Sequence, residues 1–232
     1  MRSDIFVLGL LGVVAMGCGA VEPAQELRAE IVEANAMVQG KTITAWTEAW
    51  WHWTFGVPAD QNPELVLEQD CAVGQDESVF FVPAYDGATK YQRTCVIPQD
   101  KPVLVPLWVV INDYPCPDPA FEPPAGQSFE EFLREGAMGY NDAVQNLVVT
   151  VDGETVEAKM HRHTTGLIEF TAEKTLVGAL PDPCLTGMKQ SGVSDGFWLM
   201  VNLTGGSHEV HVTGVNPSGE AIDYTYVLSG SP

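Results

Sequence analysis

The C-terminal stretch FWLMVNLTGGSHEVHVTGVNPSGEAIDYTYVLS, residues 197–229, decides the fold. It contains three apolar runs rich in β-branched and aromatic residues, 197–203, 208–215 and 221–229. The turn sequence TGGS separates the first two runs, and NPSGE separates the second from the third. Short runs of this kind with turn residues between them are typical of consecutive β-strands. The end of the chain therefore predicts a sheet.

Further strand signals precede this stretch. Ser78–Pro83 and Tyr91–Ile97 flank the sequence AYDGATK and predict a hairpin. A second hairpin is predicted within residues 147–158, because Asp152-Gly153 is a strong type I′ turn signal. Residues 167–172 predict one more strand.

Residues 102–111, PVLVPLWVVI, are almost entirely apolar. Such a run is typical of a strand that is buried on both faces. Pro106 lacks a backbone N–H, so we expect a bulge or a sheet edge at this position.

Two helices are predicted beside the strands. In Thr42–Phe55, residues Ile43, Trp46, Trp50 and Trp53 recur at the spacing of one helical face. These tryptophans form either a sugar-binding platform or a core, and we favour a core because the indoles lie in one apolar stripe. The second helix, residues 128–146, begins with a capping box of Ser128 and Glu131.

Many short strands, few helices and no βαβ rhythm predict a mainly β protein. We expect a single β-sandwich, immunoglobulin-like or jelly-roll-like, with two attached α-helices. The domain would comprise residues 41–232, after a tether at residues 18–40 and a signal peptide at residues 1–17.

The N-terminus resembles a bacterial lipoprotein signal. Residues 5–16 form an apolar run that is too short to span a bilayer but suits the core of a signal peptide. Small residues then lead to Cys18. We expect the chain to be cleaved just before Cys18 and this cysteine to be lipidated. The alternative is an ordinary secretory signal. Gly19 is not Asp, which by the usual sorting pattern implies an outer-membrane lipoprotein in the cell envelope.

The other four cysteines predict two disulfides, because an exported protein meets an oxidising compartment. Four cysteines allow three pairings. We expect Cys71–Cys95, which brackets the predicted hairpin, and Cys116–Cys184, whose loops YPCPDP and PDPCLTG are similar. A zinc site is the alternative, but the sequence contains no C-x-x-C pair.

The formal net charge is −20. A chain this acidic repels phosphate backbones, so we expect no nucleic-acid partner. The expected partners are the membrane, through lipid on Cys18, and an unidentified ligand of the envelope or its surroundings.

Three sequence blocks together resemble an uncharacterised family of exported bacterial proteins. They are the W-x-x-x-W-W-x-W helix, the C-x-x-G-Q…R-x-C-x-V/I-P segment from Cys71 to Pro98, and the ending D-G-[YF]-W-L that begins at Asp195. The blocks span Trp46 to Leu228. The segment from Asn62 to Cys71 lacks the usual Asp and Gly, and Asp100 stands where Gly is common. The resemblance implies no activity.

The sequence contains few residues that indicate chemistry. Trp51 lies off the apolar stripe of the helix, so Trp51 and its neighbour His52 are candidate ligand-binding residues. His161, His163 and His211 are candidate metal ligands, although surface histidines explain the pattern as well. Gly192–Gly196 matches G-x-S-x-G, but a strand follows where a nucleophile elbow needs a helix.

We therefore expect a lipid-anchored ligand-binding or interaction module without a cofactor and without catalytic residues. The first alternative is a secreted hydrolase whose acidic and histidine residues meet in space. The second is a metal-binding envelope protein. A pocket that contains Trp51 and clustered carboxylates would favour the hydrolase.

Overall fold

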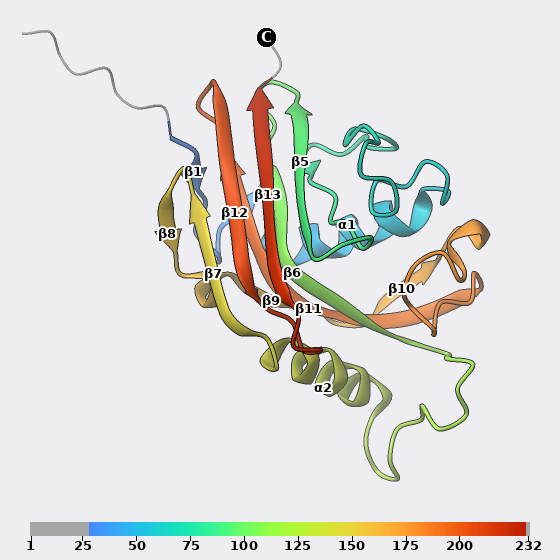
Figure 1. The fold of residues 1–232 in the computed structure, drawn as a ribbon. Helices are drawn as coiled ribbons and strands as arrows, with labels where there is room; N and C mark the ends of the chain where they lie inside the picture. Colours follow the sequence, from blue (N-terminus) through green and yellow to red (C-terminus); the bar gives the residue numbers. More distant parts are fainter. Residues whose placement is uncertain (1–27, 231–232) are drawn as a thin grey trace, which may run out of the picture.

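The computed structural model describes residues 28–230, so the predicted signal peptide and Cys18 lie outside the described residues. This part of the chain is mixed α/β and mainly strands, with two α-helices and three β-sheets, none of them closed (Figure 1). None of its helices is long and apolar enough to cross a membrane.

The first sheet is organised around its longest strand, β11 (Lys189–Asn202). It contains six strands, the other five being β1 (Glu30–Ile31), β4 (Phe80–Phe81), β6 (Val103–Tyr114), β9 (Arg162–Thr164) and β10 (Ile168–Thr171). β4 runs parallel to β6, and β11 is antiparallel to its four partners.

The second sheet brings the C-terminal strands together with an earlier one. Its order is β5 (Lys90–Ile97), β13 (Ala221–Gly230), β12 (Ser207–Val215), β7 (Gln145–Val151) and β8 (Glu154–Val156). β5 and β13 are parallel, and the other pairs are antiparallel. The third sheet is the small pair β2 (Met37–Val38) and β3 (Lys41–Thr42), and two 3₁₀ turns occupy Ala158–His161 and Lys174–Leu176.

Two apolar clusters form the core, and the six-stranded sheet contributes to both. Val103, Val105 and Leu107 of β6 pack in a cluster with side chains of the five-stranded sheet. Leu104 of the same strand belongs to the other cluster, which contains the tryptophans of α1 (Ile43–Gly56). The alternation of side chains along a strand therefore places this sheet between the other sheet and the helix.

The tryptophans of α1 are core, as the spacing predicts. Trp46, Trp50 and Trp53 are 1 %, 0 % and 8 % exposed. Their indole N–H groups donate to the carbonyl oxygens of Val38, Val82 and Val73 at 2.8–2.9 Å. Each ring therefore buries its apolar faces without leaving its polar atom unpaired.

The second helix, α2 (Phe129–Asp142), begins with the predicted capping box of Ser128 and Glu131. It ends before the predicted residue 146, because Gln145 pairs with Val215 and starts β7. The buried residues of α2 are Leu133, Ala137 and Asn141, which lie on one narrow face.

Two strand predictions are confirmed in detail. Asp152 and Gly153 have φ values of +50° and +80°, the left-handed values that a type I′ turn requires, and they join β7 to β8. In β6 the register shifts beside Pro106, where Leu107 is the extra residue of a bulge.

The predicted hairpin of Ser78–Pro83 with Tyr91–Ile97 is wrong. β4 pairs with β6 in the first sheet, and β5 pairs with β13 in the second. The intervening sequence AYDGATK is a crossover between sheets. Local turn residues resemble those of a hairpin, but the pairing partners come from distant parts of the chain.

The predicted tether differs from the structure where it is described. β1 pairs with β11, through Glu30 opposite Asn202, and β2 pairs with β3. The folded part of the chain therefore begins by residue 30 and not at residue 41. The signal was weak because these strands are only two residues long.

Candidate functional site

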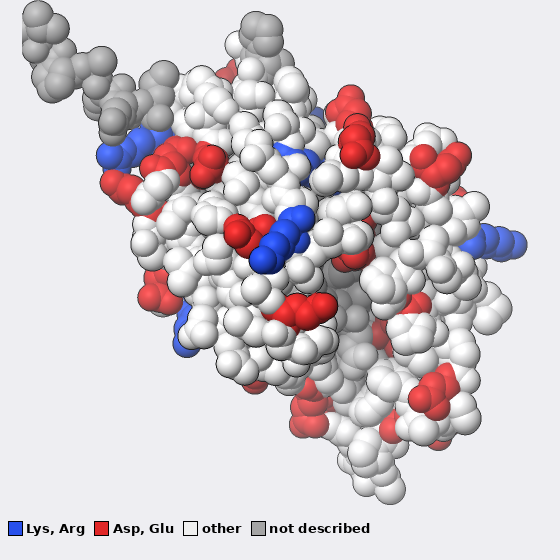
Figure 2. Space-filling model, viewed as in Figure 1, with Lys and Arg blue, Asp and Glu red and all other residues white. Residues whose placement is uncertain are grey.

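A cavity of about 1430 Å³ is the candidate site. It is lined by parts of α1, β5, β6 and β13 and by the two loops that contain Asp86 and Asp182. Figure 2 shows a face with many acidic side chains and few basic ones, hollowed near its centre. The cavity exceeds the usual range for small-molecule sites, about 300–1,000 Å³.

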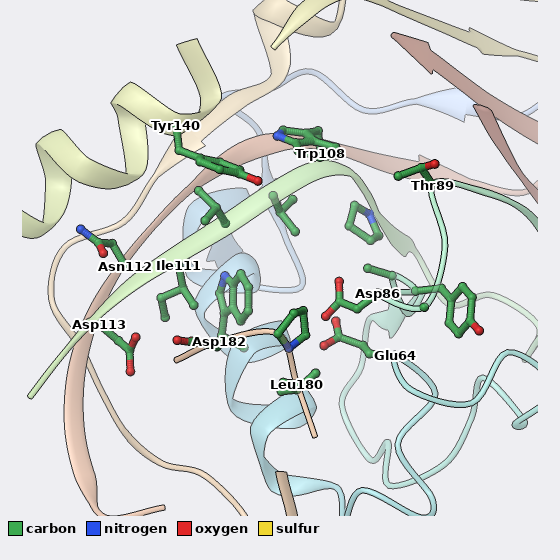
Figure 3. Close-up of a pocket in the computed structure, with 18 of the residues that line it drawn as sticks. Glu64, Asp86, Thr89, Trp108, Ile111, Asn112, Asp113, Tyr140, Leu180 and Asp182 are labelled. Carbon is green, nitrogen blue, oxygen red and sulfur yellow. The ribbon is translucent and has the colours of Figure 1, made fainter. Parts of the chain in front are cut away.

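The first acid pair consists of Glu64 and Asp86, whose carboxyl groups face one another (Figure 3). Asn62 positions Glu64, since its side-chain amide donates to the carbonyl oxygens of Thr54 and Val57 at the end of α1. The Asn62 side-chain oxygen accepts from the Glu64 backbone N–H at 2.9 Å. The end of the helix therefore fixes the position of this acid.

The second acid pair consists of Asp113, near the end of β6, and Asp182 (Figure 3). Gln190 of β11 donates to Asp113 Oδ2 at 2.6 Å. The Cys184 backbone N–H donates to Asp182 Oδ1 at 2.8 Å, and the disulfide Cys116–Cys184 connects this loop to the segment after β6. The disulfide therefore holds the two acids together.

All four carboxyl groups have raised pKa values. Desolvation raises the pKa of Asp113 to about 8, and the charge of Asp182 adds to the effect. Desolvation of its carboxyl group and the charge of Asp182 raise the pKa of Asp86 to about 6, although the residue as a whole is exposed. Burial and then the charge of Asp86 raise the pKa of Glu64, and burial raises that of Asp182. The acids therefore interact electrostatically within and between the pairs, and Asp113 holds a proton at neutral pH.

Aromatic rings form much of the remaining wall. Trp108 and Tyr140 stack with centroids 6.3 Å apart, on the opposite side of the cavity from the acids (Figure 3). Tyr91 and Tyr224 stack at 4.9 Å, and the hydroxyls of Tyr91 and Tyr226 are 2.9 Å apart. Aromatic walls with a few polar groups are typical of ligand sites.

The predicted binding residues Trp51 and His52 lie in different places. Trp51 lines the large cavity but is only 7 % exposed, and its indole N–H donates to Ser194 Oγ at 2.6 Å. His52 is exposed and lines a smaller cavity of about 520 Å³, next to Glu48 and Asp76. The structure therefore does not join them in one site.

The three predicted metal ligands are not brought together. His163 of β9 is buried, and its Nδ1 lies 3.1 Å from the Thr44 hydroxyl. Burial and then the charge of neighbouring His161 lower the pKa of His163 to about 4. His211 lies in the other sheet, where it pairs with Asp223 at 2.8 Å. Two of the three imidazoles are therefore neighbours, and the third has a different partner.

One group in the described range has the spacing of metal ligands, Asp113, Asp182 and Cys184. Cys184 is bonded to Cys116, so its sulfur is no thiolate ligand. The group therefore offers two carboxylates.

The G-x-S-x-G match is not a nucleophile elbow. Gly192–Gly196 lies inside strand β11, and Ser194 is fully buried. Its neighbour Asp195 is also fully buried and accepts hydrogen bonds from Arg162 and Asn141. This segment is structural.

The four acids of the cavity were missed by sequence reasoning. A signal existed for Asp113 and Asp182, because each lies two or three residues from a cysteine of the predicted Cys116–Cys184 disulfide. Both disulfide pairings are present, with Cys71–Cys95 as the other. No local pattern indicates Glu64 and Asp86, which meet through a loop contact.

Comparisons with known proteins add no assignment. No protein-family model matches the chain, and no curated protein matches it. A solved structure, "Solution Structure of Amebosin", is similar over 62 % of this chain and 100 % of that one, at 10 % sequence identity and a TM-score of 0.19. A similarity this low does not show a shared fold.

Proposed function

We propose that this protein is an exported envelope protein that binds a ligand in the large cavity. The single observation that supports the proposal is the wall of that cavity, which combines stacked aromatic rings with four carboxyl groups from separate loops and strands. Convergent polar groups in an aromatic cavity are the usual composition of a ligand site.

The location follows from the sequence. The signal segment and Cys18 support an outer-membrane lipoprotein, and two disulfides suit an oxidising compartment. For the architecture, we propose a β-sandwich of the two large sheets, supported by the apolar cluster that contains side chains from both. An immunoglobulin-like or a jelly-roll-like topology remains our prediction.

Native mass spectrometry tests ligand binding. The protein is incubated with a fractionated small-molecule extract of the cell envelope and then desalted. We expect a bound small molecule on the wild type and none on Thr89→Trp, because an indole at Thr89 would fill part of the cavity. Thr155→Trp is the matched control, since Thr155 is exposed on β8, away from the cavity. Identical spectra of wild type and Thr89→Trp would contradict the proposal.

A hydrolase is the second candidate, because the cavity contains both Trp51 and clustered carboxylates. The raised pKa values of Asp113, about 8, and Asp86, about 6, provide groups suited to general acid and base roles. No histidine is among the described residues that line the cavity, so the predicted combination of acids and histidines is not assembled there. We therefore place ligand binding first. Hydrolysis of an envelope glycan that Asp113→Asn abolishes would reverse this order.

A further inference from the structure

The charge balance of the cavity wall is strongly one-sided. The acidic residues that line it are Glu64, Asp86, Asp113, Asp118, Asp182 and Glu220. Within residues 28–230, Lys90 is the one basic residue of the lining, and it is exposed. An anionic ligand would be repelled here, and a neutral one would leave the acids facing one another.

The neighbours of Glu64 offset its burial only in part. It is 3 % exposed and points into the cavity beside Asp86 (Figure 3). The nearby Thr54 hydroxyl lowers its pKa, but by less than burial and the charge of Asp86 raise it. Buried Arg93 lies close enough to lower the pKa too, yet its Nη2 donates to the carbonyl oxygens of Pro63 and Val66. A buried carboxyl that faces a second carboxyl at the cavity wall favours a ligand that brings positive charge to the pair.

The opposite wall suits an apolar or cationic chain. Trp108 and Tyr140 stack across from the acids, and Tyr140 is 44 % exposed (Figure 3). Aromatic faces attract cations as well as methylene groups. The cavity volume leaves room for an extended ligand.

A metal ion explains these features less well. Calcium takes six to eight oxygen ligands, whereas the described group with metal-ligand spacing offers the carboxylates of Asp113 and Asp182. An ion bound there would not reach the aromatic wall.

We propose that the ligand of this cavity is an organic cation of the polyamine type, with ammonium groups for the two acid pairs and an alkyl chain for the aromatic wall. This inference rests on the proposed ligand-binding function. Each ammonium would donate charge-assisted hydrogen bonds to one pair, Glu64 with Asp86 or Asp113 with Asp182. Binding would favour the charged carboxylates and so release protons from acids whose pKa burial has raised.

Isothermal titration calorimetry with spermidine and putrescine tests the inference, and butanediol is the neutral counterpart of putrescine. We expect both amines to bind, spermidine more tightly, and butanediol to show no binding. The measured enthalpy should depend on the ionisation enthalpy of the buffer, because binding releases protons. Glu64→Gln and Asp182→Asn should each weaken spermidine binding roughly tenfold.

Glu169→Gln is the matched control, since it removes the same charge at an exposed position on β10. It should leave binding unchanged. Circular dichroism checks that each variant is folded. Glu64→Gln should fold, because glutamine mimics the protonated acid. Equal weakening by Glu169→Gln would overturn the inference, because it would indicate attraction by net charge alone.

The two proposals fail in different ways. If neither amine binds, or if butanediol binds as well as putrescine, the polyamine inference is overturned. Loss of the bound molecule in Thr89→Trp would still support a ligand cavity. If wild type and Thr89→Trp retain the same molecules from the extract, the cavity itself is not the binding site.

Discussion

The backbone N–H of Asp86 donates a hydrogen bond of 3.0 Å to the carbonyl oxygen of Glu64. This contact holds two loops side by side and places two carboxyl groups against one another in the cavity wall (Figure 3). Facing carboxylates repel, so folding alone gives no reason for the arrangement. The pair is one of the features on which the proposed binding site rests.

Stability should fall as the pH rises. The folded state binds more protons than the unfolded state, because the pKa of Asp113 is raised from 3.8 to about 8 and that of Asp86 to about 6. The stabilisation is complete below the unfolded pKa and is lost as the pH rises through the folded values. We expect the melting temperature to fall between pH 5 and pH 9.

Asp113→Asn should flatten this fall, since asparagine cannot ionise. At pH 9 its melting temperature should exceed that of the wild type by at least about 2–4 °C, the shift expected for 1 kcal/mol in a domain of this size. Asp60→Asn, an exposed change of the same charge, is the control. Parallel pH profiles for Asp113→Asn and the wild type would count against the raised pKa.

Trp50→Ala should destabilise the fold by about 3–5 kcal/mol, as truncation of a large buried aromatic does. Trp50 is fully buried and touches Trp51, Trp53 and Trp198. His52→Ala, two residues along the same helix and exposed, should have little effect. Thermal unfolding decides, and a shift below about 1 °C for Trp50→Ala would refute a core role.

Asp195→Ala should cost about 3–5 kcal/mol, because it leaves the charge of Arg162 without its buried partner. Asp142→Ala removes the exposed partner of the same arginine and should cost about 0–1 kcal/mol. Urea unfolding of the two variants measures the difference. Equal costs would mean that burial of Asp195 adds nothing to the ion pair.

Replacing Cys116 and Cys184 together with serine should destabilise the protein by about 2–4 kcal/mol. It should also flatten the pH profile, because the loop that holds Asp182 against Asp113 loses its covalent tie. Replacing Cys71 and Cys95 should lower stability without changing the profile. Peptide mapping without reductant verifies both pairings first, and free thiols at these positions would contradict them.

Cys18→Ser should release the protein from the membrane fraction or leave the precursor uncleaved, since the acylated residue is lost. Cell fractionation and the mass of the product measure both effects. The Cys71→Ser/Cys95→Ser protein should still reach the membrane, which makes it the control. Normal processing and membrane partition of Cys18→Ser would refute lipidation.

Sequence patterns predicted what depends on near neighbours. The helix with Trp50 at its centre, the Asp152-Gly153 turn and the bulge beside Pro106 are local consequences of periodicity and backbone chemistry. Strand partners were not predictable in the same way. In the sequence, β4 and β5 resemble the two strands of a hairpin. In the structure β4 pairs with β6 and β5 pairs with β13, and the residues between β4 and β5 do not specify these partners.

The four acids of the candidate site were not predicted, although the sequence contained a signal for two of them. Asp113 and Asp182 lie beside the two cysteines of one disulfide, so the sequence contained their proximity. Glu64 and Asp86 are joined by a single backbone hydrogen bond between loops, and such contacts leave no periodic signal. Trp51 was predicted to lie off the apolar stripe, yet it is buried in the same core cluster as Trp50, and His52 lines a different cavity.

The pairing of β13 with β5 has a consequence for biosynthesis. Leu228 lies opposite Cys95, so the second sheet closes only when the last residues of the chain are available. The first sheet likewise waits for β11 to meet β6. A nascent chain of about 180 residues contains the strands of the β4–β6 and β7–β8 pairs, but it can complete neither sheet, and contacts of long sequence separation form slowly. Both sheets are therefore completed late in synthesis, and under the proposed export this order would keep the chain unfolded for threading through a secretion channel.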